Sequence, residues 1–249
     1  LSARVRVGII RDLFSLAEAG SIPTTDALEF LSAYKIVDNY TVWLELAMGL
    51  GRLEQLLARR SLGEDGLNKL ILDLFSPLVT RLGWNLKDKE LHTDILLRSL
   101  AISRAGRAGN EKIIAKARKK FNQMQKGGYV NPDLRGAVYS IIAKWSGKRE
   151  YNIFIKKYKK ETLHEEKNRI GSALSDFRDE KLLKLTCEFA FGKDVRIQDT
   201  IGILSSVGAN PSGRDIWLHC IQKNWKMLVS RYGDGGHTLA RLVKAISSS

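Results

Sequence analysis

Residues 110–145 read NEKIIAKARKKFNQMQKGGYVNPDLRGAVYSIIAKW, and this stretch decides the fold class. On both sides of Gly127-Gly128, apolar residues recur every three or four positions, as they do in amphipathic helices. Asn131-Pro132 offers an N-cap followed by proline at the first helical position, so we expect a helix from Pro132 to Trp145. Because a short connection makes neighbouring helices antiparallel, the stretch predicts a helical hairpin.

The same periodicity recurs along the rest of the chain, and no strand-like alternation exceeds a few residues. The connections are short, so we expect an all-α fold: an α-solenoid of antiparallel helical hairpins, of the HEAT or armadillo kind, as a single domain over residues 1–249. A compact helical bundle is the alternative. Pro77 lies inside an expected helix and predicts a kink or a break there. The expected helices span residues 3–19, 25–34, 40–57, 66–82, 89–104, 110–125, 132–145, 149–159, 163–175, 179–191, 197–205, 211–223, 225–232 and 238–246.

The net charge of +14 is unevenly placed. Between Arg104 and Lys160 there are sixteen lysines and arginines against Glu111, Asp133 and Glu150, so nearly all of the excess lies in this quarter of the chain. Such a field favours an anionic partner, which can be nucleic acid, an acidic protein or the carboxylate of a peptide. No apolar run approaches the roughly 20 residues that cross a bilayer, so no membrane partner is expected.

No segment carries a complete catalytic or metal-binding pattern. His164-Glu165 begins like a zinc motif, but Asn168 stands where the second histidine is needed. The glycines at 233–236 lack the strand and the lysine of a phosphate loop, and a turn is expected there. Cys187 and Cys220 are too few for a disulfide framework, and we interpret them as buried free thiols of a reducing compartment. We therefore expect no catalytic residue, metal ligand or cofactor within this chain.

The basic run at 156–160 has two interpretations. It can grip phosphates with Tyr158 stacked on a base, or it can be a solvated helix face whose apolar residues, Tyr158 included, belong to the core. No nucleic-acid-binding motif accompanies it, so nucleic acid is not expected as a partner. Large aromatic residues at helical spacing usually pack, so we expect Trp217 and Trp225 in the core.

Eight short motifs, in chain order, resemble the C-terminal domain of puromycin-sensitive-type zinc aminopeptidases, which belong to the gluzincin family. They are Asp12-Leu13-Phe14-Ser15-Leu16-Ala17, Asn39-Tyr40-Thr41-Val42-Trp43, Phe75-Ser76-Pro77-Leu78, Arg81-Leu82-Gly83-Trp84, Leu96-Leu97-Arg98, Asp133-Leu134-Arg135 with Val138-Tyr139, Glu165-Glu166-Lys167-Asn168-Arg169-Ile170, and Asn210-Pro211-x-Gly213 with Trp217 and Lys223-Asn224-Trp225.

The resemblance implies a HEAT-like, non-catalytic domain that curves over the catalytic cleft, encloses it and helps to bind and select peptides. The parent enzyme is then a zinc metallo-aminopeptidase that removes N-terminal residues from peptides, with the zinc held by another domain of the same chain. The lack of an initiator methionine before Leu1 and the helical pattern already present there suggest a fragment, slightly shortened at its C-terminus. The resemblance and the free thiols together suggest a cytoplasmic location. An independent basic helical-repeat scaffold that binds acidic proteins or nucleic acid is the alternative.

Three residues within these motifs are the candidates for contact with the peptide: Arg98, Arg135 and Tyr139. An arginine can bind a carboxylate through two hydrogen bonds. The alternative is that Arg98 and Arg135 form salt bridges between helices near Asp94 and Asp133. Where some endoplasmic-reticulum relatives hold a peptide C-terminus, this chain has Gln55 and Asp176, so that pocket does not transfer directly.

Overall fold

A computed structural model gives the fold, and it describes residues 1–59, 64–233, 239–240 and 242. Within these residues the chain forms helices and no strand. The bounded elements are α1 (Ala3–Glu18), α2 (Thr24–Phe30), the 3-10 helix η1 (Leu31–Ile36), α3 (Tyr40–Arg59), α4 (Asp65–Leu82), α5 (His92–Arg107), α6 (Glu111–Gln125), α7 (Pro132–Lys144), α8 (Lys148–Lys160), α9 (His164–Leu174), α10 (Glu180–Ala190), α11 (Ile197–Ala209) and α12 (Arg214–Tyr232).

The chain packs into two compact units. Unit 1 holds residues 1–57 and 63–113, and unit 2 holds residues 58–62 and 114–249. In unit 1, Trp43 of α3 packs edge-on against Phe75 of α4, with the ring centroids 5.2 Å apart. Gly49 of α3 lies against Phe14 of α1 so closely that a Cβ there would stand 2.0 Å from the phenyl ring. Only a glycine lets α1 and α3 approach this far.

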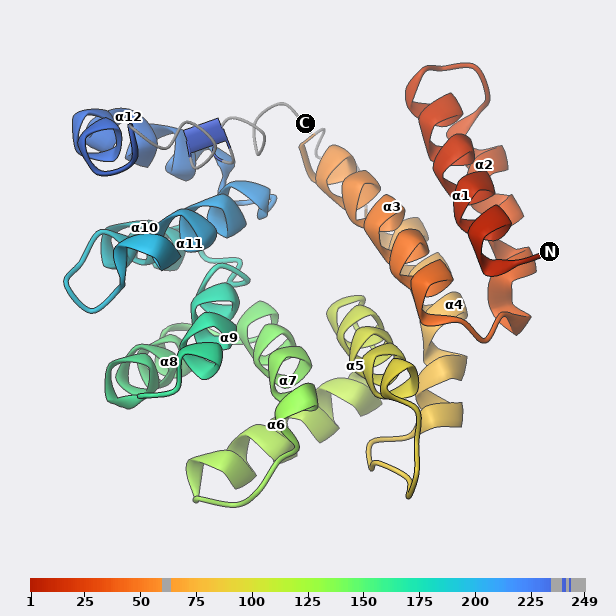
Figure 1. Cartoon of the computed structure of the whole chain (residues 1–249), viewed down its shortest axis with the longest axis horizontal. Helices are drawn as coiled ribbons and strands as arrows, with labels where there is room; N and C mark the ends of the chain where they lie inside the picture. Colours follow the sequence, from red (N-terminus) through yellow and green to blue (C-terminus); the bar gives the residue numbers. More distant parts are fainter. Residues whose placement is uncertain (60–63, 234–238, 241, 243–249) are drawn as a thin grey trace. The chain divides into compact units, whose positions relative to one another are not determined.

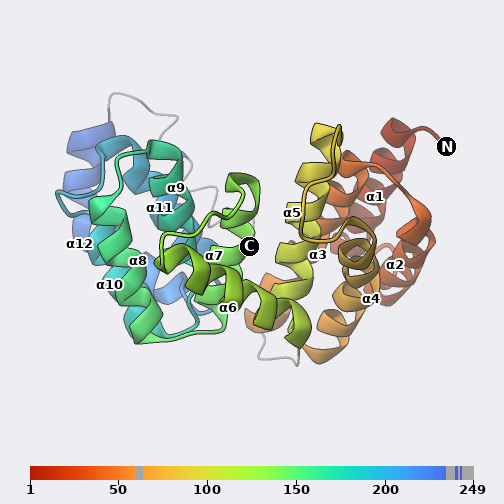
Figure 2. The same ribbon diagram turned by 90° about the horizontal axis from the view of Figure 1, so that it is seen from below.

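From α7 to α12, the helices of unit 2 form two rows. In Figure 1, α7, α9 and α11 form one row, and α8, α10 and α12 form the other. Helix α9 packs on both α7 and α11, while α10 packs on α12. Seen from below in Figure 2, α8 and α10 lie side by side, and the Thr186 hydroxyl of α10 donates to the Tyr151 hydroxyl of α8 at 3.3 Å. The all-α, solenoid-like class predicted from the sequence is confirmed.

A chain of buried rings holds α6, α7 and α8 together in unit 2. Phe154 of α8 lies 5.3 Å from Phe121 of α6 and 5.4 Å from Tyr139 of α7, measured between ring centroids. It also lies 6.1 Å from Phe177, which follows α9. These ring contacts fix the three helices against one another and so set the positions of the polar side chains around them.

Several local predictions are confirmed. The Asn131 side chain accepts a hydrogen bond from the Asp133 amide at the start of α7, and Pro132 occupies its first turn. Gly20, after α1, has the positive φ of 70° expected of a helix-terminating glycine. Of the two outcomes predicted for Pro77, a break does not occur, because α4 runs on to Leu82. Pro77 itself is exposed, and buried residues on both sides of it hold the helix against its neighbours.

Other boundaries differ from the predictions. The two helices expected over residues 211–223 and 225–232 are one continuous helix, α12, within which the Asn224 amide donates to the carbonyl of Cys220 at 2.8 Å. The helix expected over residues 25–34 divides into α2 and the 3-10 helix η1. The helix expected over residues 238–246 falls largely outside the described residues, although Leu239, Ala240 and Leu242 are helical.

Candidate functional site

The most unusual polar group of unit 2 is the carboxylate of Glu166, which is 1 % exposed at the start of α9. It accepts a hydrogen bond from the hydroxyl of Tyr139 on α7 and another from Arg169 Nη1 at 3.2 Å. Two more cations approach it: Arg135 Nη1 of α7 at 3.5 Å and Lys157 Nζ of α8 at 3.7 Å. One buried carboxylate is therefore shared by three cations and a phenol from three helices.

Local sequence explains why these groups meet. Glu166 lies in the first turn of α9, where the positive end of the helix dipole favours a negative side chain. Arg169 stands three residues later on the same helix face, so it reaches the same carboxylate. Arg135 and Tyr139 are four residues apart on α7 and therefore share a face as well.

The electrostatic balance keeps Glu166 ionised. Burial alone would raise the pKa of its carboxyl group, but the hydrogen bond from Tyr139 and the charges of Arg135 and Lys157 outweigh burial and hold this pKa below its ordinary value. Burial and the hydrogen bond to Glu166 raise the pKa of the Tyr139 phenol far above its ordinary value. The tyrosine is therefore a neutral donor and the glutamate a charged acceptor, and the surplus of positive charge around them remains.

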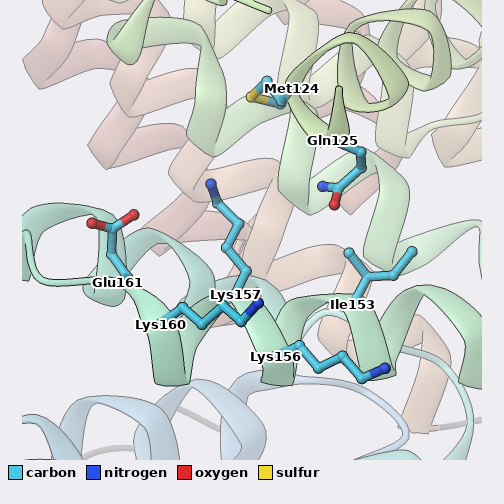
Figure 3. Close-up of a pocket in the computed structure, with 7 residues that line it drawn as sticks. All are labelled: Met124, Gln125, Ile153, Lys156, Lys157, Lys160 and Glu161. Carbon is cyan, nitrogen blue, oxygen red and sulfur yellow. The ribbon is translucent and has the colours of Figure 1, made fainter. Parts of the chain in front are cut away.

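An open pocket of about 420 Å³ lies beside this cluster. It is lined by Met124, Gln125, Ile153, Lys156, Lys157, Lys160 and Glu161, and we call it the basic pocket. Figure 3 shows the ammonium group of Lys157 directed toward Met124 and Gln125 across the pocket. Since Lys157 also pairs with Glu166, it connects the pocket to the buried carboxylate behind it. Three ammonium groups around an accessible hollow can hold a carboxylate or a phosphate.

The three sequence-predicted site residues lie in different surroundings. Arg98 is 0 % exposed in unit 1, where it pairs with Glu90 and donates to the Leu82 carbonyl from both Nε and Nη2 at 3.2 Å. Arg135 and Tyr139 both join the Glu166 cluster of unit 2. Tyr139 is 0 % exposed, while the Arg135 side chain keeps 25 % of its surface accessible.

Contact of these residues with a peptide stays a prediction. The alternative of inter-helix ion pairs holds for Arg135, whereas the partner of Arg98 lies in the connection before α5. Arg98 pairs with Glu90 instead of Asp94, and Arg135 pairs with Glu166 across helices. Lys157 lies in the basic run at 156–160 that the sequence analysis considered, whereas Glu166 and Arg169 were not recognised as site residues. In the sequence, Glu166 is one of several charged residues of an amphipathic helix, and this pattern does not distinguish a buried carboxylate from a solvated one.

The aromatic and thiol predictions have different outcomes. Tyr158 is 1 % exposed and packs on Phe189 with the ring centroids 5.1 Å apart, so it belongs to the core and is not available to stack on a base. Trp217 is buried as expected, but the prediction for Trp225 is wrong: this residue is 45 % exposed because the described segments leave it uncovered on α12. Cys187 and Cys220 are free and buried, as predicted.

The described residues do not form a site that fits a zinc ion. Across the described ranges, no three His, Cys, Asp or Glu side chains come together in a way that can hold a metal. His164 lies exposed at the start of α9. Among the same residues, no helix combines the length and the apolar composition needed to cross a membrane.

Comparisons with known proteins assign this architecture to a family. The model of a family described as the ERAP1-like C-terminal domain matches residues 1–249. The chain is 30 % identical over 234 residues to Aminopeptidase M1-A of Oryza sativa subsp. japonica, covering 90 % of this chain and 26 % of that protein. It is 27 % identical over 239 residues to the puromycin-sensitive aminopeptidase of Caenorhabditis elegans, covering 94 % and 25 %.

A third relative is the human endoplasmic reticulum aminopeptidase 2, which is 26 % identical over 254 residues, covering 100 % of this chain and 26 % of that protein. The chain therefore spans about a quarter of the length of the curated relatives that it matches.

Proposed function

The chain belongs to the family of ERAP1-like C-terminal domains, as its motifs suggested. From this premise we propose that it is the non-catalytic domain of a zinc-dependent aminopeptidase, which encloses the active-site cleft and helps to bind peptide substrates. The parent enzyme removes N-terminal residues from peptides, and the zinc belongs to a catalytic domain of the same parent chain. The observation that carries the proposal is the family match over residues 1–249, together with relatives named as aminopeptidases of which this chain spans about a quarter.

The physical role follows from enclosure and charge. A helical wall over a cleft excludes folded proteins and gives the distal part of a peptide a surface to bind. Positive side chains on that wall attract the peptide carboxylate through charge-assisted hydrogen bonds. The surplus of cations around Glu166 supports this role, because three cations face only two carboxylates, those of Glu166 and Glu165. A contact made only when the enzyme is closed would couple peptide length to catalysis.

Among the three candidate contact residues, Arg135 is our choice for the residue that reaches the peptide. A quarter of its side-chain surface is accessible, whereas Arg98 and Tyr139 are interior and support the framework around the site. Buried free Cys187 and Cys220 support a reducing, cytoplasmic location. The name of the endoplasmic reticulum relative shows that the family is not confined to that compartment.

The test uses the native full-length protein that carries this chain. Arg135→Ala is compared with Arg231→Ala, which removes an equally charged, exposed side chain from α12. For a peptide of about ten residues we expect Arg135→Ala to lower kcat/KM about tenfold, the value of one charge-assisted hydrogen bond. An aminoacyl-coumarin, which is too short to reach the wall, should be hydrolysed as before. Equal losses on both substrates would assign Arg135 a purely structural role and remove the peptide contact.

The chain by itself gives a second test. We expect no hydrolysis of an aminoacyl-coumarin and no stoichiometric zinc, because the described part offers no converging ligand set. Chelator-sensitive hydrolysis by the purified chain would contradict its non-catalytic assignment.

A further inference from the structure

Helices α6 and α8 meet along a seam, and two hollows lined by residues of both helices lie along it. Phe121 and Phe154 close the middle of this seam, with the ring centroids 5.3 Å apart. The basic pocket lies at the end of the seam nearest the C-termini of both helices. A second hollow of about 160 Å³, near the start of α8, is lined by Arg118, Phe121, Asn122, Ile142, Ser146, Arg149 and Glu150. We refer to the two hollows together as the α6–α8 groove.

Cations stand on both walls of the groove. Arg118 belongs to α6, while Arg149, Lys156 and Lys160 belong to α8. Within the described part of the chain, neither Lys156 nor Lys160 has an ion-pair partner, and both are exposed. A third hollow of about 660 Å³ lies along α6, and Lys119 and Lys126 line it. Ammonium groups clustered in this way create a positive potential that attracts an anionic ligand.

The floor of the basic pocket is not charged. Met124 of α6 and Ile153 of α8 face it from opposite walls, and both are only partly buried (Figure 3). A thioether and a branched alkyl group between lysines offer a place for one apolar side chain, since a methionine adapts its shape to what it contacts. The groove thus combines carboxylate-binding groups at its rim with an apolar floor.

We propose that the α6–α8 groove binds an acidic peptide segment of a partner protein. Its carboxylates pair with Lys156, Lys160 and Arg149, and one apolar side chain fits between Met124 and Ile153. From residue 149 to residue 160 the groove follows α8 for roughly 16 Å, which about five residues of extended peptide span. The proposal rests on the charge and shape of unit 2 and does not depend on the aminopeptidase assignment.

A peptide fits the groove better than nucleic acid does. Glu150 and Glu161 line the two hollows, so a continuous row of phosphates would meet a carboxylate at each of them, whereas carboxylates of a peptide can be spaced to avoid them. Binding to single strands relies on exposed rings on which bases stack. The rings of the seam, Phe121, Tyr158 and Phe154, are all buried.

The experiment measures fluorescence anisotropy with the full chain and three labelled probes. The first is an eight-residue peptide of glutamates with one central leucine, the second has serine in place of the leucine, and the third is a ten-nucleotide oligo-dT. The test variant is Lys156→Glu/Lys160→Glu. Its matched control is Lys184→Glu/Lys226→Glu, which makes the same change of charge at exposed positions of α10 and α12.

We expect the leucine peptide to bind, and its affinity to fall about tenfold or more in Lys156→Glu/Lys160→Glu but less than about threefold in the control. The serine peptide should bind about fivefold more weakly than the leucine peptide, because the apolar contact is lost. Higher salt should weaken all binding. All four substituted lysines are exposed, so both variants should keep the circular dichroism of the parent chain.

Four outcomes would overturn the proposal. Equal losses in both variants would mean that only the overall positive charge attracts the peptide. No binding of the leucine peptide would mean that the groove is not a peptide site. Equal affinity for the serine and leucine peptides would remove Met124 and Ile153 from the site. Tighter binding of oligo-dT than of the leucine peptide, with the same loss in Lys156→Glu/Lys160→Glu, would assign the groove to nucleic acid instead.

Discussion

Arg98 in unit 1 and Glu166 in unit 2 are each the centre of a buried charged group, and the two groups differ in how their charges balance. In unit 1, Arg98 is fully buried and faces one carboxylate, Glu90, whose side chain is 6 % exposed. The Leu82 carbonyl accepts two further hydrogen bonds from the same guanidinium. In unit 2, the carboxylate of Glu166 is the buried member, and it faces three cations whose side chains are 25–27 % exposed.

This difference separates a structural centre from one that can bind a ligand. One positive and one negative charge, both enclosed, leave no field for an outside partner, so the Arg98 centre serves to join α5 to the end of α4. Arg135, Lys157 and Arg169 face Glu166, and Arg169 also pairs with Glu165, so one positive charge is in excess. One of these cations, Lys157, lines the basic pocket. Burial of a charge therefore does not by itself identify a functional site, but an unbalanced set with accessible members does.

The largest expected effect is that of Arg98→Met. The substitution leaves the Glu90 carboxylate and the Leu82 carbonyl without their donor in a closed interior, which typically costs about 3–5 kcal/mol of stability. Urea denaturation gives the change, and hydrogen exchange should show faster exchange in α4 and α5. In Arg98→Met/Glu90→Gln the uncompensated charge is gone, so part of the loss should be recovered. A double variant that is less stable than Arg98→Met would contradict this account of the centre.

Glu166→Gln should cost less stability but change binding. The introduced amide would keep a polar group near Tyr139 and lose the charge-assisted hydrogen bonds, so we expect a loss of about 2 kcal/mol and faster hydrogen exchange in α7 and α9. The three cations would then lack their carboxylate, and an acidic peptide should bind the basic pocket more tightly. Arg98→Met is the control, because it should leave peptide affinity unchanged at temperatures where the variant is folded. If peptide affinity does not rise in Glu166→Gln, the cluster does not contribute to the field of the pocket.

Acid should weaken both centres. The hydrogen bond from Arg98 chiefly holds the pKa of Glu90 below its ordinary value of 4.5, and the pKa of Glu166 is also below this value because its donors and cations outweigh burial. A carboxyl group with a lowered pKa in the folded state stabilises the protein fully above its ordinary pKa, and this stabilisation disappears as the pH falls below it. Stability should therefore decrease from about pH 5 downward. In Glu166→Gln this decrease should be smaller, and an unchanged acid limb would contradict the assignment for Glu166.

Much of the fold could be predicted from the sequence, because helix formation depends on local signals. The start of α7 at Asn131-Pro132 and the end of α1 at Gly20 are each determined by a few neighbouring residues. The join at Asn224 could not be predicted, since a side chain that bonds back to its own helix looks like a helix end in the sequence.

The candidate site was less predictable, for a physical reason. Glu166 lies 27 residues from Tyr139 along the chain, and their hydrogen bond exists only after α7 and α9 have packed together. The same is true of Arg98, whose partner Glu90 was not the nearer acidic residue in the sequence, Asp94. The charge excess between Arg104 and Lys160 could be counted in advance, but which of its members are paired depends on tertiary packing.

The smallest effects are expected at exposed ion pairs, which test whether burial or distance distinguishes the two centres. Arg81 and Asp38 of unit 1 approach to 3.0 Å, with 45 % and 63 % of their side chains exposed, and Lys159 and Asp194 of unit 2 approach to 3.2 Å, with 51 % and 34 % exposed. Asp38→Asn and Asp194→Asn should each change stability by less than about 0.5 kcal/mol in urea denaturation, because water solvates the released partner and salt screens the pair. These two pairs are shorter than the contacts of Glu166 with Arg135 and Lys157, at 3.5 and 3.7 Å, so distance alone would rank them as the stronger interactions. A loss in Asp194→Asn as large as that in Glu166→Gln would mean that proximity, and not enclosure, determines the strength of the Glu166 cluster.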